Sequence, residues 1–156
     1  MELSPRQVSD SRTVISQVMK AEQSNPFNTM HGGEMVKVMD NTAGICAIRH
    51  TNQPVATKAI NSIVFHQPIY VGDLIACRAY LTFVKQKIME IRAELYVEDS
   101  SYQAPGLAAS GYFYHVALNL ASRSTLFLPP LELVSEEESQ RFEQGLKRLE
   151  QMRSKT

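Results

Sequence analysis

The apolar positions between Gly33 and His50 predict one long helix. They recur around most of a helical wheel instead of along one narrow stripe, at Met35, Val36, Val38, Met39, Ala43, Ile45, Ala47 and Ile48. Arg49 and His50 place positive charge at the carboxyl end, which the helix dipole favours, and the polar HTNQP segment then ends the helix. We therefore expect a central helix that is enclosed on most sides.

After Pro54 the pattern changes to segments rich in β-branched, aromatic and alternating residues, which predict four strands. These segments are VATKAINSIVF, LIACRAYLTFV, IMEIRAELYVE and LAASGYFYHVAL. Turn-forming stretches separate them: QPIYVGD, the short Lys85-Gln86-Lys87 turn and the polar DSSYQAPG. Before the helix, residues 5–22 are polar with scattered apolar positions and fit a strand or edge segment that leads into a loop.

The third of these strands alternates cleanly between two faces. One face carries Met89, Ile91, Ala93, Leu95 and Val97, and the other carries Glu90, Arg92, Glu94, Tyr96 and Glu98. We expect a sheet with one packed side and one wetter side.

The tail predicts a second helix on the surface. Ser135 is a cap residue, and Glu138 lies three positions later, where its side chain can reach back in a capping box. A thin apolar stripe of Phe142, Leu146 and Leu149, with Met152 as a further candidate, then runs through charged sequence and suits packing on a surface or a neighbouring subunit. We expect one domain over residues 1–133 and an amphipathic helix and tail over 134–156.

One long helix followed by consecutive strands, without alternation of strand and helix, predicts an α+β fold in which a curved antiparallel sheet wraps the helix. The length of 156 residues, 44% of them apolar, suits a single core. Long strands at a sheet edge need covering, and pairing with a second copy covers them economically. We therefore expect a dimer.

Charge and cysteine content narrow the function classes. Sixteen basic residues balance sixteen acidic ones, so no overall field favours nucleic acid or an anionic membrane. Cys46 and Cys77 lie inside apolar runs and read as buried thiols of a reducing compartment. No run approaches the roughly 20 apolar residues of a membrane span, and the first residues lack an apolar segment, so we expect a cytoplasmic protein.

Asp40 is the unusual residue of the central helix. Its helical neighbours at three and four positions are Val36, Lys37, Ala43 and Gly44, three of which are apolar or small. Partial desolvation penalises a carboxylate and suits a general base. The alternative is a structural aspartate that binds backbone amides of a neighbouring strand.

Residues just upstream add to this candidate site. Glycines at His31-Gly32-Gly33 allow close approach to the backbone, and free N–H groups at a helix start can bind an anion or a developing oxyanion. Asn25 offers an amide that could orient water or a carbonyl. Each also has a plain interpretation, since a Gly-Gly pair can be an ordinary turn and Asn-Pro an ordinary turn starter.

Other chemistry is disfavoured. The chain contains no GxSxG elbow, Walker loop, GxGxxG motif or metal-spaced His/Cys cluster, and we expect no cofactor. His66 and His115 read as structural histidines. Four basic residues could form a local phosphate-binding patch or could simply be solvated: Lys58, Arg78, Lys85 and Lys87.

The order of motifs over residues 20–133 resembles the cytosolic acyl-CoA thioesterases of the hotdog fold, the brain-type acyl-CoA hydrolases and their bacterial relatives. The landmarks are Asn25, His31-Gly32-Gly33, Asp40, Arg49-His50, Val55, Thr57, Phe65, Pro68-Ile69, Val71-Gly72-Asp73, Met89-Glu90, Phe113, Val116-Ala117-Leu118 and Pro129-Pro130-Leu131. Three positions depart from the pattern: Asn28 replaces a usual glycine, Asn61 an acidic residue and Ile88 a small polar one.

The resemblance implies dimers with a continuous sheet, often assembled as a trimer of dimers, that hydrolyse acyl-CoA to free acid and CoA. It implies that Asp40 is the base or nucleophile, that Asn25 acts with it across the dimer interface, and that amides near Gly32 and Gly33 polarise the thioester carbonyl. It also suggests that Ile88 and Asn61 influence the CoA channel or acyl preference. A module of this fold that binds acyl-CoA without turnover is the alternative function, and a hydratase ranks last.

Overall fold

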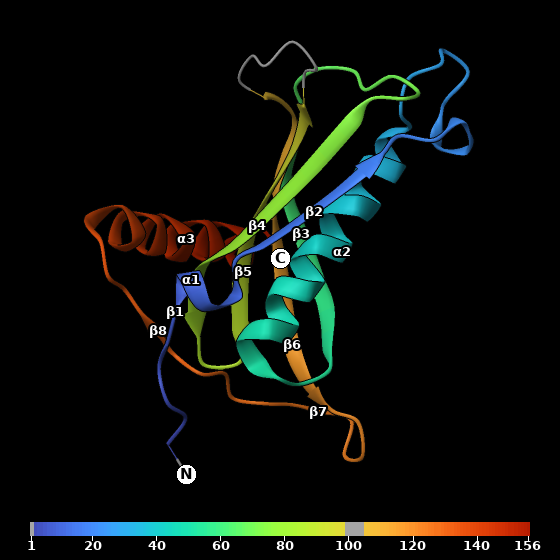
Figure 1. Ribbon diagram of the computed structural model, residues 1–156. Coiled ribbons are helices and arrows are strands. Elements are labelled where there is room, and N and C mark those ends of the chain that lie inside the picture. Colours follow the sequence, from blue (N-terminus) through green and yellow to red (C-terminus); the bar gives the residue numbers. More distant parts are fainter. Residues whose placement is uncertain (1, 99–104) are drawn as a thin grey trace.

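The structure is a computed structural model that describes residues 2–98 and 105–156. A long helix lies on one face of an antiparallel sheet, and a second long helix lies against the other face (Figure 1). The elements in chain order are β1 (Arg6–Gln7), α1 (Val8–Ser11), β2 (Thr13–Val18), η1 (Ala21–Gln23), α2 (Gly32–Thr51), β3 (Val55–Phe65), β4 (Leu74–Lys85), β5 (Ile88–Glu98), β6 (Gly106–Asn119), β7 (Ser124–Thr125), β8 (Leu131–Glu132) and α3 (Glu136–Ser154). The predicted α+β hotdog architecture is confirmed.

The main sheet has the order β2-β4-β5-β6-β3, with β7 added to β6. All of its pairs are antiparallel. Each of the four predicted strands after Pro54 agrees with the structure to within one residue at either end. The predicted DSSYQAPG connection lies at residues 99–106, of which 99–104 are outside the described residues.

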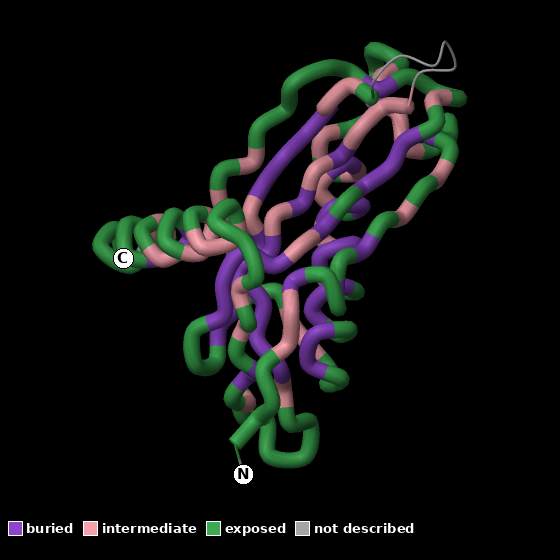
Figure 2. The backbone as a smooth tube through the Cα atoms, turned by 60° about the vertical axis from the view of Figure 1, so that its left-hand side comes forward, coloured by how far each residue is buried: buried purple, intermediate pink, exposed green. Residues whose placement is uncertain are grey.

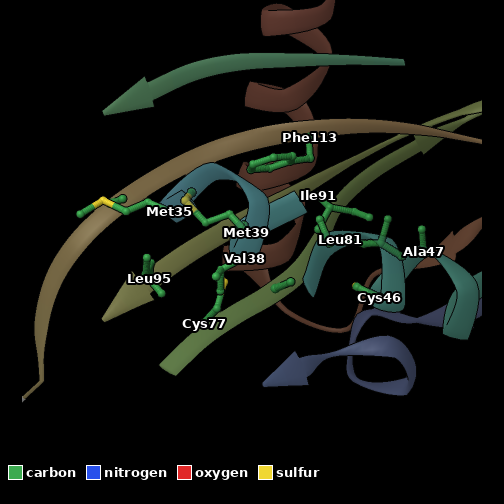
Figure 3. Close-up of a cluster of buried hydrophobic side chains, with 14 of the residues drawn as sticks. Met35, Val38, Met39, Cys46, Ala47, Cys77, Leu81, Ile91, Leu95 and Phe113 are labelled. Carbon is green, nitrogen blue, oxygen red and sulfur yellow. The ribbon is translucent and has the colours of Figure 1, made fainter. Parts of the chain in front are cut away.

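The central helix α2 spans one residue more at each end than the pattern predicted. Met39, Ala43, Cys46 and Ala47 are fully buried against the sheet (Figure 3). Their partners include Cys77 and Leu81 of β4, Ile91 and Leu95 of β5 and Phe113 of β6. Cys46 and Cys77 are free and buried, as expected.

The outer face of the sheet is not uniformly wet. Arg92 and Glu94 are half-buried, but Glu90 is fully buried, which contradicts its predicted place on a wetter face. The cause is α3, whose apolar stripe covers this end of the sheet. Phe83, Ile88, Tyr114 and Leu149 form a separate buried cluster there, with Phe142, Leu146 and Met152 packed against it.

The predicted cap of α3 is present with one difference. Ser135 Oγ accepts from the N–H of Glu138 at 3.1 Å. The Glu138 carboxylate reaches back to the N–H of Val134, at 2.8 Å, instead of the N–H of Ser135. Both contacts still satisfy backbone donors at the helix start.

Strand β3 is one edge of the sheet. It is 11 residues long and pairs only with β6 along the described strand order, and its pairing register shifts after Thr57 and after Asn61. Ile60, Val64 and Phe65 are between 42% and 53% exposed there. A long apolar edge of this kind invites pairing with another strand.

Two further features concern the ends of the chain. The short strands β1 and β8 pair in parallel and join the beginning of the chain to the segment before α3. Burial is densest in the middle of the sheet and along α2, while α3 keeps an exposed outer side (Figure 2). Among the described residues, no helix is both long and apolar enough to cross a membrane.

Candidate active site

Asp40 lies in the middle of α2 and faces strand β3. The hydroxyl of Thr57 donates to Oδ1 of Asp40 at 2.7 Å. The Asp40 side chain remains 36% exposed in the single chain, so it is partly desolvated, as the sequence predicted. Its partner is a side chain and not the backbone amides of the alternative interpretation. Among the described residues, no hydrogen bond to Oδ2 is present.

His115 completes this cluster from β6. Its Nε2 lies 3.2 Å from Thr57 Oγ1 and 3.9 Å from Asp40 Oδ1. Burial lowers the pKa of His115, although the Asp40 carboxylate opposes that shift. The sequence analysis treated His115 as structural and used Thr57 only as a landmark. Only the register, which pairs Thr57 with His115, reveals that these side chains meet.

These three side chains open onto a cavity of about 510 Å³. Its remaining wall is mostly small or apolar, and the complete lining is Ile15, Asp40, Asn41, Gly44, Ile45, Ile48, Val55, Thr57 and His115. Ile45 and Ile48 are 36% and 47% exposed. The site therefore combines one carboxylate with an apolar surface, which suits a small polar reacting group on an apolar ligand.

His31 is the N-cap residue of α2. Its Nδ1 accepts from the N–H of Gly33 at 3.0 Å. This bond occupies one of the two amides that the sequence assigned to a developing oxyanion. Gly32 lies under the ring of Phe65, where an added Cβ would come within 3.2 Å of the ring. A larger residue at this position would therefore crowd the Phe65 ring, which would have to shift slightly.

The helix start borders a second cavity, of about 440 Å³, lined by Met30, Gly32, Met35, Phe65, His66, Gln67 and Pro68. Asp40 is not part of this cavity. Eight residues separate Gly32 from Asp40, which is about 12 Å along the helix axis at a rise of about 1.5 Å per residue. Within one chain, the amides of the helix start and the Asp40 carboxylate are therefore too far apart to contact the same carbonyl group of a ligand.

Asn25 closes its own turn. Its Oδ1 accepts from the N–H groups of Phe27 and Thr29, at 2.9 and 3.2 Å, and its Nδ2 donates to Thr29 Oγ1 at 2.9 Å. Asn28 in the same turn has φ of 62°, which explains why glycine suits this position. Asn25 and Asp40 are not brought together within the single chain.

The four basic candidates do not form one patch. Lys85 and Lys87 flank the exposed β4–β5 turn, and the Lys87 ammonium lies 4.7 Å from the centre of the Phe127 ring. Arg78 lies seven residues from Lys85 on the same strand, about 23 Å away. Lys58 is on β3, three strands from β4. Of the two interpretations that the sequence left open, a single patch is excluded for Arg78 and Lys58, and Lys85 and Lys87 remain candidates for phosphate binding.

Of the three positions that depart from the family pattern, two lie near α3. Ile88 belongs to the buried cluster beneath α3, on the sheet face opposite α2. Asn61 lines a separate cavity with Arg148, Gln151 and Lys155 of the same helix region. In the single chain neither residue borders the cavity of Asp40.

Comparison with known proteins places residues 27–103 within the thioesterase superfamily model. The chain is 35% identical to the human cytosolic acyl coenzyme A thioester hydrolase over 154 residues, covering 97% of this chain and 40% of that protein. It therefore spans about 40% of the length of this relative. It is 33% identical over 108 residues to an uncharacterized acyl-CoA thioester hydrolase of Zymomonas mobilis, covering 69% of this chain and 72% of that protein.

Solved structures show the same fold. An acyl-CoA hydrolase from Staphylococcus aureus, in complex with butyryl coenzyme A, coenzyme A and coenzyme A disulfide, aligns with a TM-score of 0.88 at 23% identity. That alignment covers 96% of this chain and 91% of the other. An apo hexameric acyl-CoA thioesterase aligns with a TM-score of 0.91 at 24% identity, covering 98% and 97% of the two chains.

Proposed function

Because this chain belongs to the thioesterase superfamily, we propose that it hydrolyses acyl-CoA thioesters to a free acid and CoA. The observation that carries the proposal is the Asp40 carboxylate, which is held by Thr57 in the wall of a partly apolar cavity. The names of the relatives, acyl-CoA thioester hydrolases, support the substrate class.

Asp40 acts in one of two ways in this proposal. As a base, it takes a proton from water while the water oxygen attacks the thioester carbon, and the C–S bond then breaks as the sulfur gains a proton. As a nucleophile, its carboxylate attacks that carbon, releases the CoA thiolate and forms an anhydride that water hydrolyses. With Oδ1 bound to Thr57, Oδ2 is the oxygen directed to either task.

The site takes its second half from another copy of the chain. Within one chain, Asn25 lies in its own turn and the helix start lies about 12 Å from Asp40. Strand β3, which carries Thr57, is an exposed apolar edge that can pair with its symmetry mate. We propose a homodimer in which Asn25 and Gly32 of one copy approach Asp40 of the other. The hexameric thioesterase of the same fold supports higher assembly.

Lys85 and Lys87 are proposed to attract the phosphates of CoA. Both side chains are exposed on one turn. Their positive charges attract phosphate groups over a distance that becomes shorter as the salt concentration rises. Replacing both by alanine is expected to raise KM with kcat retained, and the difference in KM should shrink at high salt.

CoA enters only as part of the substrate and product. The cytosolic relatives support a cytoplasmic location.

A free-thiol assay with a panel of acyl-CoA chain lengths tests the function. We expect turnover by the wild type and a loss of about 100-fold or more in kcat for Asp40→Asn, since the amide is neither base nor nucleophile. Glu150→Gln removes an exposed acid from α3, on the other face of the sheet, and should retain activity. Binding of acyl-CoA without turnover by the wild type would favour the non-catalytic module instead.

Mixing two inactive variants tests the shared site. Asn25→Ala and Asp40→Asn proteins are each expected to be inactive with the fold intact. After subunit exchange, about a quarter of the wild-type rate should return, because half of randomly paired dimers are mixed and each holds one intact site. No recovery despite demonstrated exchange would reject the shared site.

A further inference from the structure

His115 is buried beside the proposed catalytic carboxylate and has no role assigned to it. Only 1% of its surface is exposed, and its Nε2 points at Thr57 Oγ1, 3.2 Å away. Its Nδ1 is buried without a hydrogen-bond partner among the described residues. A buried imidazole with one ring nitrogen unpaired is costly, and that cost calls for an explanation.

The hydrogen bonds define which atoms donate. A carboxylate only accepts, so the single proton of the Thr57 hydroxyl belongs to the 2.7 Å bond with Asp40. Thr57 Oγ1 therefore accepts from His115, which must carry its proton on Nε2. The result is a directed chain in which His115 donates to Thr57 and Thr57 donates to Asp40.

The surroundings keep the ring neutral. Burial lowers the pKa of His115, and the opposing effects of the Asp40 carboxylate and the Phe113 carbonyl are smaller. On the elements packed against the ring, α2 contributes Asp40 as a charged group, while β3 and β5 present the uncharged Thr57 and Met89 at the paired positions. In a neutral ring with its proton on Nε2, Nδ1 carries only a lone pair and has no proton to donate, so the Phe113 carbonyl would accept from it only in the charged ring.

We propose that His115 is a positioning residue for the hydrolysis, which fixes the Thr57 hydroxyl as a donor to Oδ1 of Asp40 and so aims Oδ2 at the reacting atoms. This inference rests on the proposed function. It assigns His115 no contact with the substrate and no proton transfer.

The first test separates kcat from KM. In His115→Leu the hydroxyl of Thr57 loses its donor, and we expect kcat to fall about 10-fold or more, with KM little changed, because small misplacements of a reacting group cost rate. His115→Gln can place an amide N–H near the position of Nε2 and should recover much of the loss. A purely structural role would give no such recovery by a polar residue.

A matched control is available at His50. This histidine is also fully buried, with Nε2 on the Pro129 carbonyl and Nδ1 unpaired among the described residues, but it lies ten positions beyond Asp40 on α2. His50→Leu should therefore lower stability without lowering kcat at temperatures where the protein is folded. An equal loss of kcat in both variants would overturn the proposal.

A double-mutant cycle tests the route of action. If His115 acts through Thr57, His115→Leu should cost little in a Thr57→Val background, since the hydroxyl it positions is already gone. A full and additive loss in that background would overturn the inference, as would wild-type kcat in His115→Leu alone. Failure of the proposed function gives a different result, namely a wild-type protein that turns over no acyl-CoA.

Discussion

Arg148 of α3 binds the fully buried carboxylate of Glu90 on β5 through two hydrogen bonds, of 2.7 and 3.2 Å. The same carboxylate accepts from Thr82 Oγ1 at 2.6 Å and from the Tyr114 hydroxyl at 2.5 Å. Burial of a carboxylate is tolerated because these donors replace water. The C-terminal helix is thus attached to the sheet by polar contacts as well as by its apolar stripe.

Removing the cation should destabilise the fold. Arg148→Ala leaves Glu90 buried without its counter-charge, and we expect a loss of about 3 kcal/mol in the free energy of unfolding, at the low end for a broken buried pair because the Arg148 side chain keeps 19% exposure. Urea unfolding measures this loss. Glu137→Gln, which breaks the exposed pair with Arg141 and leaves the contact of Arg141 with the Tyr80 ring in place, should cost well under about 1 kcal/mol. Equal losses would contradict the interpretation.

Gly145 should not tolerate alanine, although alanine is the better helix former. An added Cβ would lie 2.4 Å from Cδ1 of the buried Phe83 and 2.9 Å from Glu90 Oε1. The gain in helix propensity is about 1 kcal/mol, and overpacking a core typically costs about 1–3 kcal/mol. We expect a lower melting temperature for Gly145→Ala and no loss for Gln144→Ala at the exposed neighbouring position. A stabilised Gly145→Ala protein would refute the close packing.

The two buried thiols should make stability fall in alkaline solution. Burial raises the pKa of Cys46 and of Cys77 from 9.0 to about 11 in each case. Between these values the folded chain keeps protons that the unfolded chain releases, so the free energy of unfolding falls as pH rises. The slope per thiol is about 1.4 kcal/mol per pH unit.

Urea titrations at several values between pH 8 and pH 11 measure this slope. The comparison is with the Cys46→Ala, Cys77→Ala double variant, because every other titratable group is common to the two proteins. That variant is expected to be less stable near neutral pH but to show a clearly flatter dependence. The same slope in both proteins would exclude the thiols as its cause.

The exposed edge of β3 should control assembly. Val64→Arg places a charge on the apolar edge, where Val64 is 47% exposed. We expect sedimentation to show a smaller species and the thiol assay to show lost turnover, because a charge there opposes strand pairing between copies. Val14→Arg is the matched change on β2, the opposite edge, where Val14 is 57% exposed. Dissociation by Val14→Arg alone would place the contact between copies at β2 and not at β3.

The sequence predicted which segments form helices and strands better than it predicted which of these elements lie side by side. Helix α2 and the four long strands were recognisable because each buries a periodic set of apolar residues. Periodicity gives no strand order, so the pairing of β3 with β6, and with it the meeting of Thr57 and His115, could not be predicted. Glu90 was misplaced for a similar reason, since alternation shows its face of the strand but not the helix that covers it.

The candidate site was predicted in part. Asp40 stood out because a carboxylate is unusual among apolar helix positions, and the structure gives it a partner and a cavity. Asn25 and Gly33 were chosen for their chemistry, and the single chain shows their polar groups in local hydrogen bonds. Contacts between two copies of the chain depend on surfaces that folding assembles from residues far apart in the sequence. The spacing of motifs does not encode these surfaces.

The two hydrophobic clusters on opposite faces of one sheet should make the protein open in separate steps. The cluster under α3 is small and is held partly by the Glu90–Arg148 pair, whereas α2 is buried in the larger cluster. Units with fewer buried contacts exchange their amide hydrogens through smaller openings. Backbone amides of α3 should therefore exchange before those of α2, while β4 and β5, which contact both clusters, exchange only when the whole domain unfolds.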